Sequence, residues 1–542
     1  LHNAAGQLMY SATSQQPAGS QSYIIPMKSM AGGIYFVTVR VNDKKEVMKL
    51  LEKSGMLEHK EMGGLYRFKL DNKHLIWFIL FQFFILANKN LNKPFLNEWD
   101  EQYHALVAKN LTKNILKPTL YNNPILAYDY KAWNRNHIWL HKPPLTLWFM
   151  SASISVFGNT EFAVRLPSLI FSLLSIVLSF KIILKLFDLK TALIVAYFQS
   201  ISGFLLELSG GIIASDHVDT LFIFIIETGV FTFLYFAPTK LQKRIFPEIL
   251  IMGLITALAL LTKWLTGYFI LLLFGLYMYL NEKQNVFTIF LKLSISFIIS
   301  ALAASLWYYF AFTQFKQEFL WEQLYNFKHF NQVLEGHSQA WWYFIDNARI
   351  RWNELIYIIY VYFIYKTIKN KFQPNHVFMH FWIIVPYIIF SFAKTKMPAY
   401  IAISAPAVFY MMALFCQDLW YNFSETKFKL LFKILAVSVF LLNIRYSIER
   451  TKPFHSFEEI SQKKNRILQL EKYFTKDKPN IIFGNDDSIR TMFYLDCISY
   501  SNFPSLDEIH KLTPNYHIIV LDNHRLSIEL RKNRSVTLVD LK

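Results

Sequence analysis

Two acidic residues, Asp100 and Glu101, directly follow the first long apolar run of this chain. A carboxylate at the surface of a bilayer can act as a general base toward a hydroxyl or an amine. We therefore predict that Asp100 is a catalytic base and that Glu101 belongs to the same catalytic group. The alternative, of equal weight, is that the two acids only stabilise the start of the next helix.

A histidine and a lysine precede two prolines in the segment His141-Lys142-Pro143-Pro144. The lysine ammonium is a compact charge that suits a phosphate, and the prolines fix the backbone that carries it. The segment therefore predicts phosphate binding by Lys142. A lysine that merely extends from the membrane interface toward water is the alternative.

Two further acids, Asp216 and Asp219, precede a later apolar run. A catalytic role for Asp216 and a helix-capping role are equally compatible with its position. Asp219 is interpreted as the start of the next helix.

Membrane helices must position these residues. Of the 542 residues, 54% are hydrophobic and 17% are aromatic, which excludes an ordinary soluble α/β enzyme. Runs of about 20 apolar residues are long enough to cross a bilayer. Eleven such spans are predicted at residues 75–88, 162–186, 191–209, 218–237, 247–262, 265–281, 286–311, 353–368, 376–393, 397–415 and 428–445, within a total of about 11 to 13 transmembrane helices.

The formal net charge of +18 comes from short Lys and Arg clusters between the apolar runs. This pattern follows the positive-inside rule and indicates a lipid bilayer as partner, with no nucleic acid. The rule places residues 89–161 in a large external loop, in which 145–157 forms an interfacial helix. The two cysteines, Cys416 and Cys497, fall on opposite sides of the membrane, so no disulfide is expected.

The two ends of the chain differ from its apolar middle. Residues 446–542 contain strand-like pieces at 480–483 and 517–521 and predict a small extracytoplasmic α/β domain. Residues 1–52 predict a β-rich module, and their motifs around 3–8, 30–37 and 49–51 resemble the C-terminal sorting domain of type IX (Por) secretion substrates. Such a domain normally closes a protein, so we expect a fusion, with the membrane enzyme beginning near Met56 or Met62. An unrelated β appendage is the alternative.

Residues 70–445 carry a series of motifs in one order. They are Asp100-Glu101, Lys142-Pro143-Pro144-Leu145, Arg165-Leu166-Pro167-Ser168, Ala214-Ser215-Asp216, Leu261-Thr262-Lys263, Leu306-Trp307-Tyr308, Glu335-Gly336-His337-Ser338 and Lys394-Thr395-Lys396. This series resembles the GT-C glycosyltransferases, the group that includes the aminoarabinose transferase of lipid A and the protein O-mannosyltransferases. The implied fold class is a multi-pass α-helical membrane protein of GT-C type.

The resemblance implies a polyprenyl-phosphate-linked sugar as donor and an inverting substitution at its anomeric carbon. Asp100, Glu101 and Asp216 would be the catalytic acids. Lys142, Lys263, Lys396 and Arg165 would bind the donor phosphate and stabilise its charge. Where many relatives place an Arg and a Tyr after the acidic pair, this chain has Tyr103-His104, which weakens any assignment of sugar contacts.

The resemblance also implies a divalent metal ion (Zn, Mg or Mn) held by His141 and His337. His141 replaces the usual glutamate, and histidine is itself a competent zinc ligand. Two ordinary hydrogen-bonded histidines are the alternative.

These inferences together predict a glycosyltransferase in a bacterial inner membrane, with its active site facing the periplasm. Lipid A, another glycan or an exported protein could be the acceptor. A transporter or flippase for a lipid-linked or small anionic solute is the main alternative. It predicts polar residues near span centres and related halves, whereas the candidate residues lie at span ends and no internal repeat is evident. A scaffold that only binds lipid headgroups is a third hypothesis.

Overall fold

A computed structural model describes residues 72–212, 217–236, 245–423, 426–522 and 526–540, together with four strands nearer the start of the chain. The chain divides into two compact units, Leu1–Asp71 and Asn72–Lys542. The first unit contains one antiparallel sheet in the order β1-β2-β3-β4, whose strands are β1 (His2–Asn3), β2 (Gly33–Val41), β3 (Lys44–Lys53) and β4 (Met56–His59). This sheet extends past residue 52, the predicted end of the β-rich module, because β4 includes Met56, one of the two predicted starts of the membrane enzyme. Its resemblance to a sorting domain stays a prediction.

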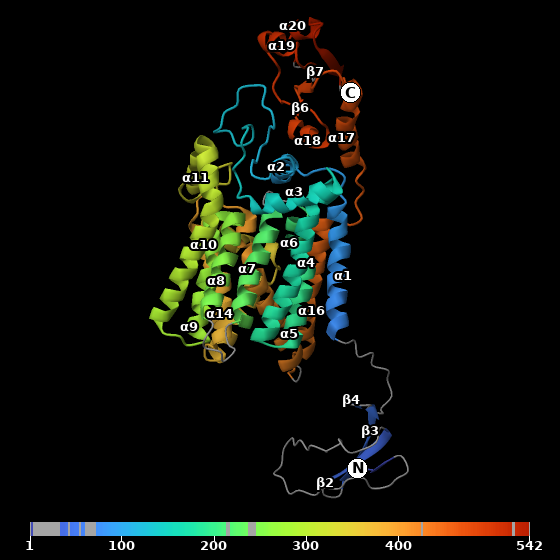
Figure 1. The fold of residues 1–542 in the computed structure, drawn as a ribbon. Coiled ribbons are helices and arrows are strands. Elements are labelled where there is room, and N and C mark those ends of the chain that lie inside the picture. Colours follow the sequence, from blue (N-terminus) through green and yellow to red (C-terminus); the bar gives the residue numbers. More distant parts are fainter. Residues whose placement is uncertain are drawn as a thin grey trace. The chain divides into compact units, whose positions relative to one another are not determined.

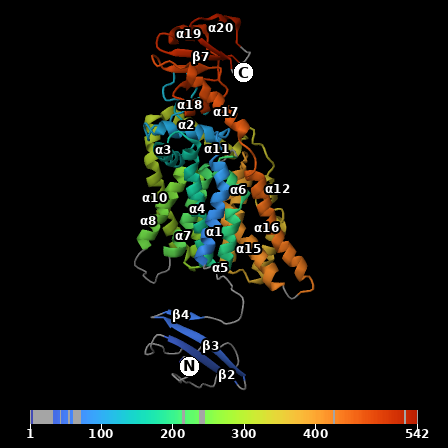
Figure 2. The ribbon, with the colours of Figure 1, turned by 90° about the vertical axis from the view of Figure 1, so that its right-hand side faces the viewer.

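The second unit is built in three layers, which are visible in two perpendicular views (Figure 1, Figure 2). A bundle of long helices forms one layer. The external loop lies across one end of the bundle, and the C-terminal residues form a cap on that loop. The bundle helices are α1 (Asn72–Leu91), α4 (Glu161–Leu186), α5 (Leu189–Ser200), α6 (Gly203–Ser209), α7 (His217–Phe236), α8 (Ile245–Lys263), α9 (Phe269–Leu280), α10 (Val286–Gln314), α13 (Ile356–Lys369), α14 (Pro374–Phe392), α15 (Ala405–Gln417) and α16 (Lys429–Thr451).

Eight helical stretches of the described residues are long and apolar enough to cross a membrane, or nine if the bent pair α5–α6 is one span. One of them, Phe246–Leu280, contains two of the predicted spans. Its chain turns back at the 3-10 segment η1 (Trp264–Tyr268), where Gly267 lies against the backbone of Ala259 and Leu260. The predicted span at 353–368 is the 14-residue helix α13. Every predicted span therefore coincides with a helix or a helix pair, and the chain is a multi-pass α-helical membrane protein.

Side-chain caps define where several of these helices begin. Thr160 accepts a hydrogen bond from the backbone of Ala163 at the start of α4, and Asp188, Ser202 and Asn285 cap α5, α6 and α10 in the same way. Such a cap satisfies a backbone N–H group that the first helical turn leaves free. The polar residues at these positions therefore set the boundaries of the apolar runs.

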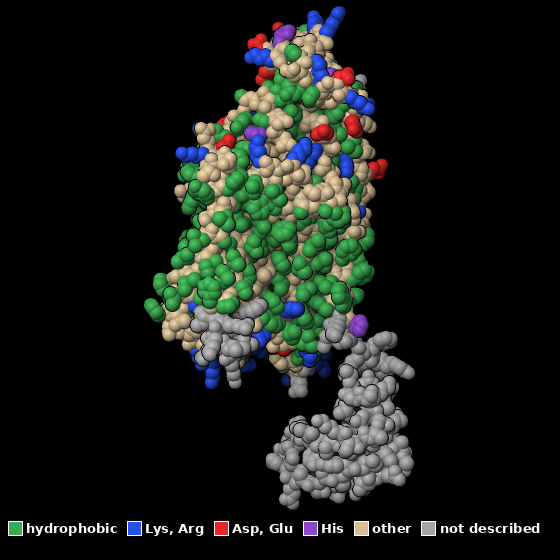
Figure 3. Space-filling model, viewed as in Figure 1, with side chains coloured by type: hydrophobic (Ala, Val, Ile, Leu, Met, Phe, Trp, Pro, Cys, Tyr) green, Lys and Arg blue, Asp and Glu red, His purple; other side chains and the backbone are tan. Residues whose placement is uncertain are grey.

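Charged and apolar side chains separate along the bundle (Figure 3). Hydrophobic side chains cover its middle, which is the surface a bilayer requires. Lys and Arg side chains collect at the end opposite the C-terminal cap, whereas both signs of charge occur beside the cap. This distribution fits the positive-inside pattern of the sequence.

The external loop is anchored by two helices and a short pairing. It contains α2 (Asp100–Leu111) and α3 (Leu145–Phe157), and α3 is an apolar helix too short to be a span, as predicted. Between them, Thr119 and Ile138 form an antiparallel bridge, and the backbone N–H of Trp139 donates to the carbonyl of Pro118 over 2.9 Å. This pairing fixes the chain just before His141 and Lys142.

The C-terminal cap is a parallel sheet with short helices, which confirms a small α/β fold. Its strands are β5 (Asn480–Phe483), β6 (Ile498–Ser499), β7 (His517–Asp522) and β8 (Thr537–Asp540), in the order β6-β5-β7-β8. Its helices include α17 (Glu458–Leu468), α18 (Ser488–Tyr494), α19 (Leu506–Leu512) and α20 (Ile528–Lys532). Ile489, Met492 and Phe493 share one hydrophobic core with the external loop. The cap thus belongs to the same compact unit as the bundle, and is not a separate body.

Candidate active site

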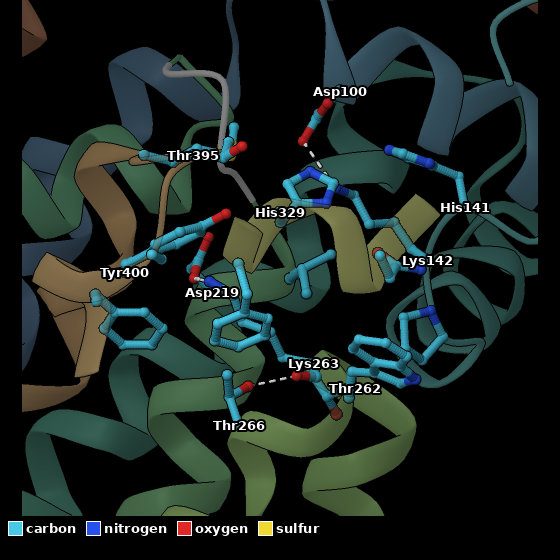
Figure 4. A pocket seen from close by; sticks show the side chains of 18 of the residues that line it. Asp100, His141, Lys142, Asp219, Thr262, Lys263, Thr266, His329, Thr395 and Tyr400 are labelled. Atoms are coloured by element: carbon cyan, nitrogen blue, oxygen red, sulfur yellow. Dashed lines mark hydrogen bonds and ion pairs between the residues drawn. The ribbon is translucent and has the colours of Figure 1, made fainter. Parts of the chain in front are cut away.

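A pocket of about 140 Å³ with both polar and apolar walls lies where the bundle meets the external loop. Its charged and polar lining comes from parts of the chain that are far apart in sequence: Asp100, His141, Lys142, Asp219, Thr262, Lys263, Thr266, Asn326, His329, Glu335, Thr395 and Tyr400 (Figure 4). The volume is smaller than the roughly 300 Å³ at which small-molecule sites begin. The pocket therefore suits the reacting groups of a substrate better than a whole lipid.

Asp100 and Lys142 face each other across this pocket. Lys142 Nζ lies 3.6 Å from Asp100 Oδ2, and their side chains are 25% and 15% exposed. Asp100 is the first residue of α2, and Lys142 is held by the prolines that lead into α3. Partial burial with an open approach is the environment in which a carboxylate and an ammonium can both act on a ligand.

A second pair, Lys263 and Asp219, lines the bundle side of the pocket. Their side chains form an ion pair that joins the end of α8 to the start of α7. Lys263 Nζ also lies 5.2 Å from the centre of the Tyr400 ring. From the sequence, Asp219 is predicted only to start a helix. The structure places its side chain in the pocket. Two of the three lysines predicted to bind phosphate, Lys142 and Lys263, therefore line one pocket.

His141 lines the pocket and is itself buried. Its Nδ1 lies 3.2 Å from Glu322 Oε2, and its ring stacks on Trp133 with centroids 4.6 Å apart. Glu322 belongs to α11 (Lys316–Asn331), which stands beside the external loop. This contact ties the Lys142 segment to α11 and thereby fixes the neighbouring ammonium.

His329 and Glu335 bring two further titratable groups to the pocket. Burial lowers the pKa of His329 below its usual value, and the charge of Lys142 lowers it further. Burial alone would raise the pKa of Glu335, but the fields of His141 and Lys142 and a hydrogen bond from Tyr325 lower it below the usual value. At neutral pH the pocket therefore contains a neutral imidazole beside a carboxylate.

Glu101 lies outside the described lining of the pocket, in a buried network below it. Arg165 Nε and Nη2 donate to its carboxylate over 2.7 and 3.1 Å, and His217 Nε2 lies 3.2 Å away. The Arg165 guanidinium also donates to the backbone carbonyls of Lys93 and Phe95. Its donors are thus directed at the external loop. This geometry supports a positioning role for both residues, in place of the predicted acid and phosphate-binding roles.

The remaining predicted site residues lie elsewhere. Lys396 is buried, and its Nζ donates to the carbonyl of Ala393 over 2.5 Å. The residues on either side of it, Thr395 and Met397, line the pocket, whereas Lys396 is outside the described lining. His337 is also outside the described lining, and Asp216 lies outside the described residues.

The predicted metal ligands are His141 and His337. His141 lines the pocket, and its Nδ1 lies 3.2 Å from Glu322 Oε2. Throughout the described residues, no group of three His, Cys, Asp or Glu side chains could hold a metal ion. A carboxylate beside one ring nitrogen is a usual partner of a histidine that binds metal through the other, so a metal held by His141 and His337 stays a prediction.

Sequence reasoning missed Asp219, His329, Glu335 and Tyr400 as site residues, and it missed a buried acid in the bundle. The first four come from helix ends and a loop that no local pattern connects. The buried acid is Glu227 of α7, which accepts hydrogen bonds from Ser175, Ser179 and Gln199. The signal for Glu227 was available, because an acid in the middle of an apolar span is rare.

Comparison with known proteins agrees with this architecture. Residues 141–314 match the family model described as Dolichyl-phosphate-mannose-protein mannosyltransferase. The chain is 26% identical over 265 residues to Undecaprenyl phosphate-alpha-4-amino-4-deoxy-L-arabinose arabinosyl transferase 2 of Proteus mirabilis, which covers 48% of this chain and 47% of that protein. The Photorhabdus laumondii transferase of the corresponding name is 24% identical over 52% of this chain and 50% of its own length. The chain thus spans about half the length of the curated relatives it matches.

Solved structures match a larger share of the chain. ArnT from Cupriavidus metallidurans in the apo state superposes with a TM-score of 0.59 at 14% identity, covering 84% of this chain and 94% of that chain. ArnT bound to undecaprenyl phosphate gives the same TM-score at 13% identity, covering 81% and 90%. An apo oligosaccharyltransferase from Archaeoglobus fulgidus gives 0.54 at 13% identity, covering 81% and 65%. This chain therefore has the GT-C fold of multi-pass membrane glycosyltransferases.

Proposed function

We propose that this chain is a glycosyltransferase that moves a sugar from a polyprenyl-phosphate donor to a lipid, glycan or protein acceptor. The observation that carries the proposal is the pocket in which Asp100 faces Lys142, with Lys263 on the opposite wall. It combines a carboxylate that can take a proton with two ammonium groups that can stabilise a phosphate. The fold supports the same conclusion, since it is shared with ArnT bound to undecaprenyl phosphate.

In the proposed reaction an acceptor hydroxyl or amine attacks the anomeric carbon of the donor. Asp100 takes the proton of the attacking group as the new glycosidic bond forms. The bond between the anomeric carbon and the phosphate oxygen breaks, and its electron pair leaves with the polyprenyl phosphate. Lys142 and Lys263 stabilise the charge of this leaving group, so a strong general acid is unnecessary. No step is routed through a metal ion.

We further propose that the chain lies in a bacterial inner membrane with this pocket on the periplasmic side. The pocket is at the end of the bundle that carries the external loop and the cap, and the Lys- and Arg-rich end lies opposite. The positive-inside rule assigns the basic end to the cytoplasm. A donor sugar exposed in the periplasm would then reach Asp100 from the outer surface of the bilayer.

Mass spectrometry of lipids and surface glycans from cells with and without the gene tests the function. We expect at least one glycan or lipid species to lose a sugar when the gene is deleted. The sugar should return with the wild-type gene but not with Asp100→Asn. If the sugar also returns with Asp100→Asn at equal protein level, or if no sugar-bearing species changes on deletion, the transferase proposal is wrong.

The same cells distinguish a flippase from a transferase. If this chain is a flippase, deletion of its gene would leave the lipid-linked sugar in the cytoplasmic leaflet. A transferase would leave that donor in the outer leaflet, accessible to a membrane-impermeant periodate reagent. Accumulation of the oxidisable donor outside therefore supports transfer, and its absence outside supports translocation.

A further inference from the structure

A second cavity, larger than the first, lies between the external loop and the C-terminal cap. Its volume is about 820 Å³, within the range of roughly 300 to 1,000 Å³ that is usual for ligand sites. Residues 93–99 form one wall, and residues of α17 together with the ends of β5, β7 and β8 form the other. The mechanism proposed above makes no use of this cavity.

The cavity opens at the point in the parallel sheet where ligands usually bind. The chain passes from β5 to β6 on one side and then returns to β7 on the other side of β5. In open α/β sheets the crevice at such a reversal, beyond the carboxyl ends of the strands, is the usual ligand site. Here that crevice is lined by Gly484, Asn485 and Asp486 after β5 and by Asp522 at the end of β7. Gly484 has a φ of +70°, and a side chain there would collide with Phe503.

The buried Arg490 guanidinium in the cavity wall has one N–H group without a hydrogen-bond partner among the described residues. The Arg490 side chain is only 8% exposed and pairs through Nη1 with Asp487 over 2.5 Å. Its Nε has no hydrogen-bond partner among the described residues. A buried donor without a partner is unfavourable, so such a group is commonly completed by a ligand or water.

The charged residues that line the second cavity indicate which class of ligand it can bind. Carboxylates line it at Glu98, Asp486, Asp487, Asp522 and Asp540, together with the cations Lys93, Lys463, Arg466 and Arg490. The five carboxylates and four cations nearly cancel, so the wall has no net positive charge that would favour a strong anion such as phosphate. Sugar hydroxyls can donate to these carboxylates and accept from the cations. The lining therefore suits a polyhydroxylated molecule.

Trp99 adds an apolar platform and connects this cavity to the pocket. It lines the second cavity and is 65% exposed, whereas the next residue, Asp100, lines the first pocket. Trp99 has a φ of 62°, a conformation that few residues other than glycine adopt. This backbone sends two consecutive side chains into two different cavities. An exposed indole face is a suitable surface on which the apolar face of a sugar ring can stack.

We propose that the second cavity binds the saccharide part of the acceptor and presents it to Asp100. This inference rests on the proposed transferase function for its reaction, but it predicts a binding event that needs no reaction. The donor lipid phosphate occupies the first pocket, and the acceptor glycan extends from Asp100 past Trp99 to the ends of β5, β7 and β8.

Saccharide binding to the full chain in detergent tests the proposal. The probe is the lipid-free oligosaccharide pool released by mild acid from the envelope of the same cells, and saturation-transfer NMR reports the bound species. We expect binding to the wild type that Trp99→Ala weakens by about tenfold or more, as for truncation of a central aromatic contact. Asp486→Asn should weaken it as well. Both residues lie on the cavity wall.

Matched controls keep the test specific. Trp341→Ala removes a tryptophan that is also 65% exposed, and Asp507→Asn removes an exposed carboxylate of the cap; neither belongs to the described lining of the second cavity. Both controls should bind like the wild type. The proposal is overturned if no saccharide binds, if the controls lose binding equally, or if mononucleotides bind in place of saccharides.

The outcome for the reaction is separate from the outcome for binding. Binding that depends on Trp99 and Asp486 supports the cavity assignment even if no sugar transfer is found. With transfer established, Trp99→Ala should raise the KM for acceptor. An unchanged acceptor KM in that variant would contradict the assignment while leaving the transferase function in place.

Discussion

Asp100 owes its proposed role to its partner as much as to its own chemistry. Lys142 forms an ion pair with the Asp100 carboxylate, but at 3.6 Å and with 25% exposure its ammonium remains able to turn toward a phosphate. A donor that draws Lys142 away would leave Asp100 with a less compensated charge. The carboxylate could then accept the hydrogen bond of the acceptor group that must lose its proton.

Replacing Asp100 by Asn tests this role directly. The variant keeps the shape of the side chain but cannot take a proton, so we expect transfer to slow by about 10²-fold to 10⁴-fold, the usual contribution of a general base. Radiolabelled sugar transfer by purified protein would measure the rate. Binding of the donor should persist, and Glu98→Gln, which changes the exposed acid on the same segment, should be nearly neutral for donor binding. A rate within a factor of a few of the wild type would remove Asp100 from the mechanism.

Glu101 illustrates how an adjacent carboxylate can serve the structure instead. Burial alone would raise its pKa, but Arg165 and the hydrogen bonds from His217 and Arg165 outweigh burial and lower the pKa below its usual 4.5. Both charged side chains are fully buried. Removing one partner of such a pair typically costs about 3–5 kcal/mol, because the other charge is left buried alone.

The pH dependence of stability follows from the lowered pKa of Glu101. A group whose pKa is lower in the folded chain stabilises fully above its unfolded pKa, and this stabilisation is lost as the pH falls through the folded value. We expect the melting temperature to fall as the pH decreases below 4.5. Glu101→Gln should melt lower at neutral pH and show a weaker decrease in acid. Equal acid sensitivity of variant and wild type in a detergent melting series would contradict this account.

At the scale of helices, one polar clamp joins three spans. Glu227 of α7 accepts from Ser175 Oγ and Ser179 Oγ of α4 over 2.5 and 2.9 Å, and from Gln199 Nε2 of α5 over 3.3 Å. Its described partners include no cation. Inside a bilayer these donors find no water to bond to, so they bond to the Glu227 carboxylate. The contacts therefore hold α4, α5 and α7 in register.

Glu227→Ala should lower the unfolding free energy by about 1–3 kcal/mol, because it leaves buried donors on α4 and α5 unsatisfied. Glu227→Gln keeps an acceptor oxygen and should cost less. Thermal unfolding of the three proteins in one detergent would rank them. An alanine variant as stable as the wild type would show that the clamp contributes nothing to the bundle.

Hydropathy and charge were sufficient to predict the bundle, because lipid imposes a length and an apolar surface on every span. The same signals could not show that Glu101 faces Arg165 or that His329 and Glu335 enter the pocket. Glu101 and Arg165 are 64 positions apart in the sequence. The places of His329 and Glu335 depend on how α11 stands beside the external loop. Asp100, Lys142 and Lys263 were found because each follows or precedes a recognisable motif. Lys396 has such a motif too, yet its side chain turns back to its own loop.

Over the whole molecule, the C-terminal cap is attached through the first turn of α4. Glu161 accepts two hydrogen bonds from Lys464 Nζ, over 2.7 and 2.9 Å, and one from the Tyr494 hydroxyl over 2.8 Å. Lys109 of α2 donates to the carbonyls of Met492 and Phe493. The cap is therefore held by polar contacts around a shared apolar core.

Glu161→Ala should loosen the cap, because Lys464 and Tyr494 lose their common acceptor. Limited trypsin digestion should then release the cap faster than from the wild type. Glu449→Ala is a suitable control, since it breaks only an exposed pair with Arg445 within α16. Equal digestion rates for Glu161→Ala and the control would show that the apolar core alone holds the cap.

The proposed sidedness makes a prediction for the two ends of the molecule. A cysteine at Asp507 in the cap should react with a membrane-impermeant maleimide in spheroplasts, whereas a cysteine at Lys371, beyond α13, should react only after permeabilisation. Both native positions are exposed, and the natural cysteines are not: Cys416 is buried and Cys497 is partly buried. Labelling at Lys371 but not at Asp507 would reverse the orientation.

The first turn of α4 has one more consequence. Glu161 binds the cap and Arg165, one turn later, binds the loop that carries Asp100, so a single rigid helix end supports both walls of the larger cavity. Spanning helices adjust their tilt to the thickness of the surrounding lipid. If α4 tilts, we expect both walls to move together with it. The width of the proposed acceptor cavity should then change little with membrane thickness.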